Sequence, residues 1–159
     1  LELFYKWLRW KLVLGCLGEM NILCVCIHNS ARSQIAEAFL DNSSKNISAM
    51  SARLEPGELN LLVVKSMQNI GIDISKNKTK SVDRILKKMI KFDFIIFVCT
   101  ESQAESCPAI PYECRKIYWS IDDPSTLKGS NSIKLKKIDK IRDQIKSKVK
   151  DFLAYYKIS

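Results

Sequence analysis

Short apolar runs alternate with segments of helical periodicity along this chain, and that alternation limits the fold more than any other feature. The runs that fit β-strands are residues 21–26, 46–52, 91–99 and 115–121. Strands that alternate with helices are typical of βαβ units, in which the strands pair in parallel and the helices cover the sheet. The pattern therefore predicts an α/β fold, a single doubly wound domain with a four-stranded parallel sheet flanked by helices.

Four segments between and after the strands have apolar side chains three and four positions apart, as an amphipathic helix requires: residues 30–40, 59–70, 81–90 and 131–156. We expect Ser30 or Ser33 to cap the first helix and Ser81 to cap the third. Gly71 follows the second helix, and a glycine commonly ends a helix at this position. In the long C-terminal helix, apolar residues would face the sheet and lysines the solvent.

The length of 159 residues, 47% of them hydrophobic, suits one well-filled core. We expect the folded domain to span residues 20–157 and the extension at residues 1–19 to lie outside it. The apolar part of that extension is too short to cross a bilayer. An amphipathic helix at a membrane surface is the alternative for this extension, but we expect no membrane partner. The formal net charge of +9 favours anionic partners, but the lysines of residues 134–150 fit the solvated face of a helix. We therefore expect no binding to nucleic acid, and we expect a monomer.

Six cysteines are present, at positions 16, 24, 26, 99, 107 and 114. They include no Cys-x-x-Cys pair, and His28 is the only histidine, so a zinc site is not expected. A core of this size does not need disulfides for stability, which favours a cytoplasmic protein with reduced, working thiols. Cys24, on the first strand, is expected to be a small buried hydrophobic residue.

The loop after the first strand has the composition of an anion site. Cys26 ends the strand, and Arg32 follows just before the first helix. The backbone N–H groups between them can form a concave nest at the helix N-terminus, which binds a tetrahedral oxyanion. Arg32 adds a planar guanidinium for two of the oxygens. We expect the oxyanion to be bound by Ile27, His28, Asn29, Ser30, Ala31, Arg32 and Ser33.

The same positive field would stabilise a thiolate at Cys26 and make it a nucleophile, with Ser33 as a hydrogen-bond donor to the sulfur. Asn29 tolerates the left-handed conformation that such a loop often needs. A nucleophile that attacks an oxyanion also needs an acid to protonate the departing oxygen. Asp123, before Pro124 at the end of the last strand, is the candidate acid, although an aspartate there can also cap a turn. We assign the turn-capping role to its neighbour, Asp122.

Four segments carry a family resemblance: "NILCVCIHNSARSQIAEAFL", "GIDISKNKTKSVD", "FDFIIFVCTESQAESCP" and "YWSIDDPS". Together and in this order they resemble the thioredoxin-coupled arsenate reductases, which share the fold of the low-molecular-weight protein tyrosine phosphatases. The resemblance covers nearly everything from Met20 to Phe152. It implies an oxidoreductase that reduces arsenate to arsenite in arsenic detoxification, with thioredoxin as electron donor and with no tightly bound cofactor or metal.

The resemblance further implies a cascade of three cysteines. Cys26 would attack arsenate and form a covalent adduct while Asp123 protonates the leaving hydroxyl. Cys99 would then attack Cys26, release arsenite and leave a disulfide. Cys107 would next attack Cys99 and form the disulfide that thioredoxin reduces. Because a disulfide requires Cα atoms within about 7 Å, we expect the loop between Cys99 and Cys107 to rearrange.

The alternative is a phosphatase that hydrolyses phosphotyrosine through a cysteinyl-phosphate at Cys26. Phosphatases of this fold typically have aromatic residues directly after the Asp-Pro pair, whereas Ser125 and Thr126 follow it here. Simple hydrolysis also leaves Cys99 and Cys107 without a role. A third reading, a non-catalytic module that binds the anion or senses redox state, predicts arsenate or phosphate binding without multiple turnovers.

The sequence departs from the family pattern in three places. Arg53 stands where the family usually has glycine, which would strain the backbone if φ were positive there. Leu61 stands at a position that is commonly proline. One branch binds potassium through an Asn, a Glu, a Ser and a later carboxylate. Asn29, Glu37 and Ser51 match the first three, but "KNKTKS" offers lysines instead of the carboxylate. We therefore expect activity that is independent of potassium, with a lysine in place of the cation.

Overall fold

A computed structural model describes residues 19–55, 57–105 and 107–158 of the chain. Four strands form its sheet: β1 (Met20–Cys26), β2 (Ile47–Arg53), β3 (Phe94–Phe97) and β4 (Arg115–Tyr118). Their order across the sheet is β2-β1-β3-β4, and every pairing is parallel. The predicted four-stranded parallel sheet is therefore confirmed.

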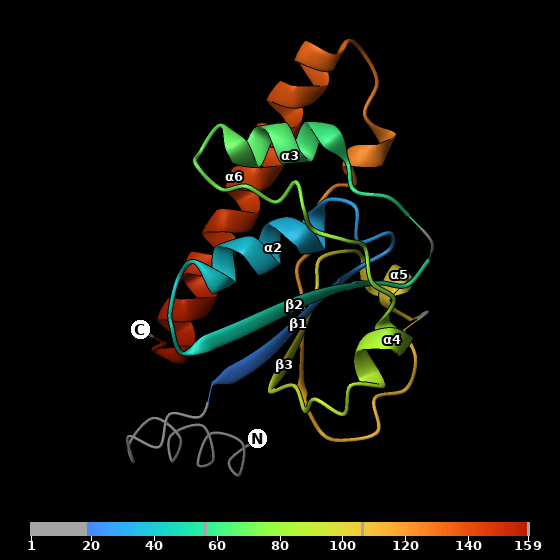
Figure 1. The fold of residues 1–159 in the computed structure, drawn as a ribbon, viewed down its shortest axis with the longest axis vertical. Helices are drawn as coiled ribbons and strands as arrows, with labels where there is room; N and C mark the ends of the chain where they lie inside the picture. The colour runs from blue at the N-terminus through green and yellow to red at the C-terminus, as the bar shows by residue number, and fades with distance from the viewer. Residues whose placement is uncertain (1–18, 56, 106, 159) are drawn as a thin grey trace.

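Helices cover both faces of this sheet: α2 (Arg32–Asp41), α3 (Leu61–Gln68), α4 (Val82–Leu86), α5 (Glu101–Ala104) and α6 (Asn131–Tyr156), with a short 3-10 helix η1 (Pro124–Thr126) before α6. Helices α2, α3 and α6 lie on one side, and α4 and α5 lie on the other (Figure 1). The chain runs from β1 outward to β2 and then returns to β3 on the opposite side of β1. This reversal places the switch point between β1 and β3, where ligands of doubly wound folds bind beyond the carboxyl ends of the strands.

The two faces of β1 serve two separate hydrophobic clusters. Ile22 and Cys24 belong to the cluster under α2 and α6, whereas Leu23 and Val25 belong to the cluster on the α4 side. All four side chains are fully buried, which explains why the strand is a continuous apolar run in the sequence. The prediction for Cys24 is confirmed, and burial raises the pKa of its thiol well above the ordinary value.

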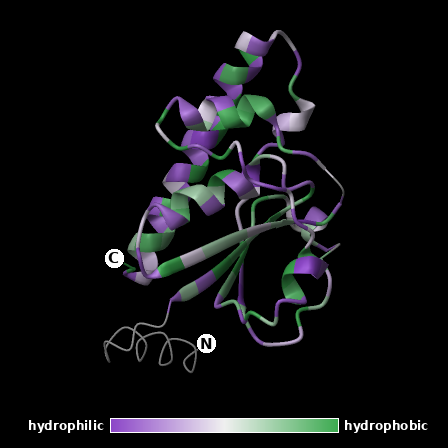
Figure 2. Cartoon of the chain, viewed as in Figure 1, coloured by the Kyte–Doolittle hydropathy of each residue, from purple (hydrophilic) through white to green (hydrophobic). Residues whose placement is uncertain are grey.

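The long helix α6 closes one face with the apolar stripe that the sequence predicts: Ile138, Ile141, Ile145, Val149 and Phe152 are all buried. Figure 2 shows hydrophobic and hydrophilic bands alternating along this helix. Phe152 and Tyr156 pack edge-on against Phe94 of β3, with ring centroids 5.1 and 4.8 Å apart. Each such buried aromatic side chain contributes about 1.5–3 kcal/mol relative to an exposed one. The lysines of α6 lie on the outer face of the helix, where most of them are exposed to solvent, as the sequence predicts.

Helix ends agree only in part with the sequence prediction. Ser81 caps α4 by accepting a hydrogen bond from the Arg84 N–H, as predicted, but α4 ends at Leu86 and not near residue 90. The predicted serine cap of α2 is wrong, because the N-cap residue is Ala31 and no side chain caps this helix. The Ser33 hydroxyl contacts Cys26 and Asn29 instead. Helix α5 was not predicted, since four residues are too few to show a helical period.

Two departures from the family pattern are accommodated by the backbone. Arg53 is not among the described residues with positive φ, so the strain considered for this position does not arise. Its Nε atom is buried without a hydrogen-bond partner in the described part of the chain. Leu61 is the first residue of α3 and is 80% exposed, at the helix position where proline is also tolerated.

Apart from the exposed Glu19, the predicted extension at residues 1–19 lies outside the described residues, and so does Cys16. Its predicted separation from the folded domain therefore stays a prediction. None of the helices in the described segments is long and apolar enough to cross a membrane.

Candidate active site

The loop between β1 and α2 is held from outside by residues 54–55 and 57–60, which follow β2. The N–H groups of Leu54 and Glu55 both donate to the Ile27 carbonyl at 2.8 Å, and the Asn60 N–H donates to the Ser30 carbonyl at 2.9 Å. These bonds use carbonyl groups of the loop and join it to a segment far away in the sequence. We call residues 54–55 and 57–60 the clamp, because they fix the backbone of the predicted nest.

Gly57 allows the clamp to approach the loop closely. A Cβ atom at Gly57 would lie 2.5 Å from the His28 Cβ and 2.8 Å from the His28 carbonyl oxygen. Neither neighbour is the flexible end of a side chain, so only glycine fits there without a shift of the backbone. His28 therefore has a packing role at the rim of the loop, half-buried against the clamp.

Backbone N–H groups at the start of α2 are available to an anion. Within the described residues, the N–H groups of Ser30, Ala31, Arg32 and Ser33 have no hydrogen-bond acceptor. The helix that begins at Arg32 also lacks a side-chain cap. Unsatisfied N–H groups at a helix N-terminus, together with the helix dipole, favour the binding of an oxyanion. The missing serine cap is thus a feature that an anion site needs.

Cys26 is 2% exposed, and its Sγ lies 2.8 Å from the Ser33 Oγ. The direction of this hydrogen bond follows from its neighbours. The Lys80 N–H donates to Asn29 Oδ1 at 3.0 Å, which leaves Asn29 Nδ2 to donate to Ser33 Oγ at 2.8 Å. Ser33 accepts at that point, so its own hydrogen is free to point at the sulfur. A hydroxyl that donates to sulfur stabilises a thiolate more than a thiol.

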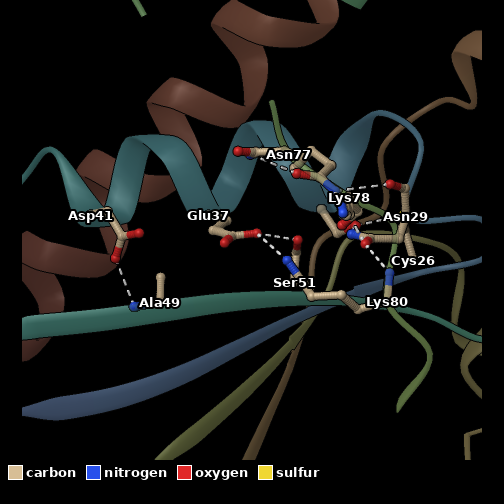
Figure 3. A network of polar contacts seen from close by, with 11 residues as sticks. Cys26, Asn29, Glu37, Asp41, Ala49, Ser51, Asn77, Lys78 and Lys80 are labelled. Carbon is tan, nitrogen blue, oxygen red and sulfur yellow. Dashed lines mark hydrogen bonds and ion pairs between the residues drawn. The ribbon is translucent and has the colours of Figure 1, made fainter. Parts of the chain in front are cut away.

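The loop changes direction at Asn29, which is fully buried and has the left-handed conformation, with φ of 49°. Two amides hold it, and neither was predicted from the sequence. Gln34, also fully buried, donates from Nε2 to both Asn29 O and Oδ1 at 3.2 Å, and Asn77 Nδ2 donates to Gln34 Oε1 at 2.9 Å. Figure 3 shows this network beside Cys26. In the sequence, only one feature points to a buried Gln34: it lies four positions before Ala38, and therefore on the same face of the helix.

Arg32 and Asp123 are far apart in the sequence and meet at the site. Arg32 is 3% exposed and donates from Nη2 to Asp123 Oδ2 at 2.7 Å and from Nη1 to the Ile121 carbonyl at 2.9 Å. The predicted anion ligand and the predicted acid are therefore an ion pair. Asp123 also caps η1, with Oδ1 accepting from the Ser125 N–H at 2.9 Å. The capping role assigned to Asp122 was wrong, because the neighbouring carboxylate makes that hydrogen bond.

Cys99 lies just after β3 and is fully buried. Burial raises the pKa of its thiol to about 11, and the remaining influences come from the other predicted catalytic residues. The Arg32 guanidinium lowers this pKa, whereas Cys26, Cys107 and Asp123 raise it. The four predicted partners of Cys99 thus all lie within electrostatic reach of its sulfur. Cys99 is therefore influenced by charges from both the oxyanion loop and the third cysteine.

Cys107 and Cys114 pack, half-buried, against the cluster on the α4 side of the sheet. Burial raises the pKa of both thiols, and the positive charge of Lys116 on β4 lowers both. All described cysteines are free thiols. Cys107 is thus the most accessible of the three predicted redox cysteines, since Cys26 and Cys99 are both buried.

Lys80 lies where a lysine was expected to replace a cation. Its Nζ is 3.6 Å from Glu37 Oε2, and the Ser51 hydroxyl donates to the same carboxylate oxygen (Figure 3). The backbone N–H of Lys80 also binds Asn29, so one residue contacts two of the three positions that match the potassium ligands. In the described segments, no three His, Cys, Asp or Glu side chains gather as a metal site.

Comparison with known proteins agrees with this arrangement. The arsenate reductase of Halalkalibacterium halodurans is 33% identical over 137 residues, which are 86% of this chain and 96% of that protein. The crystal structure of arsenate reductase from Archaeoglobus fulgidus is 32% identical, has a TM-score of 0.57 and matches 80% of this chain and 98% of its own. A low molecular weight protein tyrosine phosphatase from T. tengcongensis shares the fold, with a TM-score of 0.71 at 21% identity over 86% of this chain and 99% of its own.

Residues 21–158 match the family model of the low molecular weight phosphotyrosine protein phosphatases. The match covers the four strands, the loop after β1 and both segments that follow β3 and β4. The chain therefore belongs to the low molecular weight phosphotyrosine protein phosphatase family, in which its similar relatives include arsenate reductases.

Proposed function

We propose that this protein reduces arsenate to arsenite in arsenic detoxification, through Cys26, Cys99 and Cys107. The observation that supports the proposal most is the environment of Cys99, whose sulfur is influenced by Arg32, Cys26, Cys107 and Asp123 together. The similarity to curated arsenate reductases over 86% of the chain supports the choice of substrate. A phosphate ester alone would not need the second and third thiols.

In the first step, arsenate binds to the N–H groups of the nest. The Arg32 guanidinium then pairs with an oxygen of arsenate, and its ion pair with Asp123 breaks. The Cys26 thiolate attacks arsenic, and an As–O bond breaks. The leaving oxygen departs as water with a proton from Asp123, which is no longer held in the ion pair. The product is a covalent adduct in which Cys26 Sγ is bonded to arsenic(V). The Ser33 hydroxyl and the nest hold the negative charge of the remaining oxygens and of the sulfur.

In the second step, Cys99 attacks Cys26 Sγ as its thiol proton passes to an oxygen of the departing arsenite. An S–S bond forms and the S–As bond breaks, so its electron pair stays on arsenic and arsenite leaves. The two cysteine sulfurs supply the two electrons that reduce arsenic(V) to arsenic(III). Cys107 then exchanges with the disulfide to give Cys99–Cys107 and a free Cys26. Because Cys99 is fully buried and Cys107 follows α5, we expect the loop between the two cysteines to rearrange for this exchange.

We further propose that a dithiol protein of the thioredoxin class reduces the Cys99–Cys107 disulfide. The half-buried Cys107 is the sulfur that such a protein can reach. The reaction then needs no tightly bound cofactor and no metal. A reducing compartment such as the cytoplasm keeps the free thiols ready for the cycle, and the site lies within one chain, so a monomer suffices.

A phosphatase acting through Cys26, Arg32 and Asp123 is the second candidate, because the matching family model is named for that activity. The residues after Asp123 argue against phosphotyrosine. Pro124, Ser125 and Thr126 form η1 and give no aromatic platform for the substrate ring. The two activities can be separated because only the reductase needs Cys99 and Cys107.

The test is arsenite release in the presence of thioredoxin, thioredoxin reductase and NADPH. We expect turnover in the parent protein, no reaction in Cys26→Ser, and no multiple turnovers in Cys99→Ser or Cys107→Ser. Cys114→Ser is the matched control, since Cys114 is half-buried on the same face as Cys107, and it should turn over like the parent. Phosphotyrosine hydrolysis that persists in Cys99→Ser and Cys107→Ser, without arsenate reduction by the parent, would reverse the ranking.

A further inference from the structure

Strand β4 presents one charged side chain to the third cysteine. β4 is an edge strand, and its residues alternate between the two faces of the sheet. Arg115 lies over the Tyr156 ring of α6, and Ile117 packs against the same side. Tyr118 stacks on Phe97, which belongs to the cluster on the α4 side. Lys116 shares this second face, so it lies on the side of the sheet that carries Cys107.

A hollow of about 390 Å³ joins the two residues. Its lining contains Cys107 and Lys116, together with Phe97, Ala104, Glu105 and Tyr118. This hollow is separate from the loop around Cys26, since none of its lining residues belongs to that loop. Among the described residues, Lys116 has no carboxylate within ion-pair distance. Its ammonium is therefore not neutralised by an ion pair and acts on the thiol beside it.

The charges around Cys107 come from several elements. Burial disfavours its thiolate, and Cys114 before β4 and Asp83 on α4 act in the same direction. Glu105 at the end of α5 lines the same hollow, and Cys99 after β3 is within electrostatic reach. In the described part of the chain, the charge of Lys116 opposes these influences and lowers the pKa of Cys107. Its loss would therefore raise this pKa further.

We propose that Lys116 is a positioning residue that acts through Cys107, by stabilising its thiolate for the exchange that resolves the Cys26–Cys99 disulfide. This inference rests on the proposed function. In the exchange, the Cys107 thiolate attacks Cys99 Sγ, the Cys99–Cys107 bond forms, and Cys26 leaves as a thiolate that accepts from the Ser33 hydroxyl. The number of thiols and disulfides does not change, so no outside oxidant or reductant is required.

The test follows the reactivity of each cysteine in the reduced protein, without arsenate. The rate of Cys107 alkylation by iodoacetamide is measured against pH by peptide mass spectrometry, for the parent and for Lys116→Gln, Lys116→Arg and Lys148→Gln. We expect Lys116→Gln to raise the midpoint of the Cys107 profile by about 0.5–1 pH unit, as the loss of a partly exposed opposite charge should. Lys116→Arg should keep the parent profile, because it keeps the charge.

Lys148→Gln is the matched control: Lys148 and Lys116 both line a second hollow beside α6, but only Lys116 also lines the hollow that contains Cys107. Its profile should equal that of the parent. Asp83→Asn removes a negative neighbour and should shift the midpoint downward, and circular dichroism confirms that each variant is folded. An unchanged midpoint in Lys116→Gln, or equal shifts in Lys116→Gln and Lys148→Gln, would overturn the proposal. Because alkylation does not depend on arsenate turnover, failure here is distinct from failure of the proposed reaction.

Discussion

The oxyanion loop, residues 26–33, and the relay segment, residues 99–107, both follow a central strand, but they are held in different ways. In the oxyanion loop, the side chains of Asn29 and Ser33 are fully buried and hydrogen-bonded. The same is true of Gln34, which follows the loop on α2. In the described part of the relay segment, Thr100 makes hydrogen bonds with Ser102 and Gln103, and these bonds are exposed.

This difference matches the two tasks that the proposed reaction sets. A tetrahedral anion is best stabilised by donors that are already in place, so the loop that binds it should be fixed before substrate arrives. A thiol that must leave one partner and reach another has to move, so its segment should have few buried contacts. We therefore expect a fixed half, the oxyanion loop, and a movable half, the relay segment, within one site.

The largest effect should come from Arg32→Lys in the fixed half. A lysine keeps the charge but loses the planar fork that contacts Asp123 and the Ile121 carbonyl. We expect kcat/KM for arsenate to fall by about 100- to 1,000-fold, as removal of an oriented anion ligand commonly does. Arg84→Lys on α4 is the control and should react like the parent. An unchanged kcat/KM in Arg32→Lys would contradict the role of the guanidinium.

Ser33→Ala and Ser102→Ala compare the two halves by one matched substitution. Ser33→Ala leaves the buried Asn29 Nδ2 without its acceptor and removes the donor to Cys26. We expect a loss of about 1–3 kcal/mol in the free energy of unfolding and slower alkylation of Cys26 at neutral pH. Ser102→Ala removes an exposed hydrogen bond and should change stability by less than about 0.5 kcal/mol. Urea unfolding measures both, and equal losses would contradict the comparison.

The buried thiol of Cys99 gives the relay segment a defined pH dependence. Its pKa is raised to about 11 from the ordinary value of 9.0, chiefly by burial. A raised pKa means that the folded state binds the proton more tightly, so its contribution to stability is complete below pH 9 and is lost as pH rises through 11. We expect the alkylation midpoint of Cys99 near 11 in the folded protein and near 9 in urea. Coincident midpoints would show that Cys99 is not shielded.

The smallest effect concerns potassium. Because the Lys80 ammonium already lies beside Glu37, exchange of sodium for potassium at constant ionic strength should leave arsenate turnover unchanged. Lys80→Gln removes the internal cation and should lower the thermal stability of the parent fold by a small amount, while Lys76→Gln, an exposed lysine in the same segment, should not. A clear increase of arsenate turnover by potassium in the parent protein would contradict the idea that Lys80 replaces the cation.

Local features explain how much of this site could be predicted from the sequence. Cys26, Arg32 and the strand before them lie within one short segment, so their spacing and the apolar run were enough to predict an anion loop. The same holds for Cys24 and for the buried stripe of α6, whose periods are visible in the chain. Arg32 and Asp123 were each predicted, but their ion pair joins residues 91 positions apart and depends on the sheet order.

The remaining parts depend on contacts that no local pattern records. Gln34 has the residue type of a surface position and becomes part of the site only because Asn77 and Asn29 enclose it. Ser33 was predicted as a donor to Cys26, and this contact is present, but the hydrogen bond that the Ser33 hydroxyl accepts from Asn29 was not predicted. Lys116 has no motif at all, since its relation to Cys107 exists only once β4 lies beside the segment after α5.

The most direct test of the central claim is a single turnover of the fully reduced protein with a slight excess of arsenate and no external reductant. Arsenite is then quantified, and disulfides are mapped by mass spectrometry of the quenched protein. The proposed relay predicts one arsenite per chain, a Cys99–Cys107 disulfide in the parent and a Cys26–Cys99 disulfide in Cys107→Ser. Arsenite formation without either disulfide, or no arsenite from a folded protein with free thiols, would contradict it.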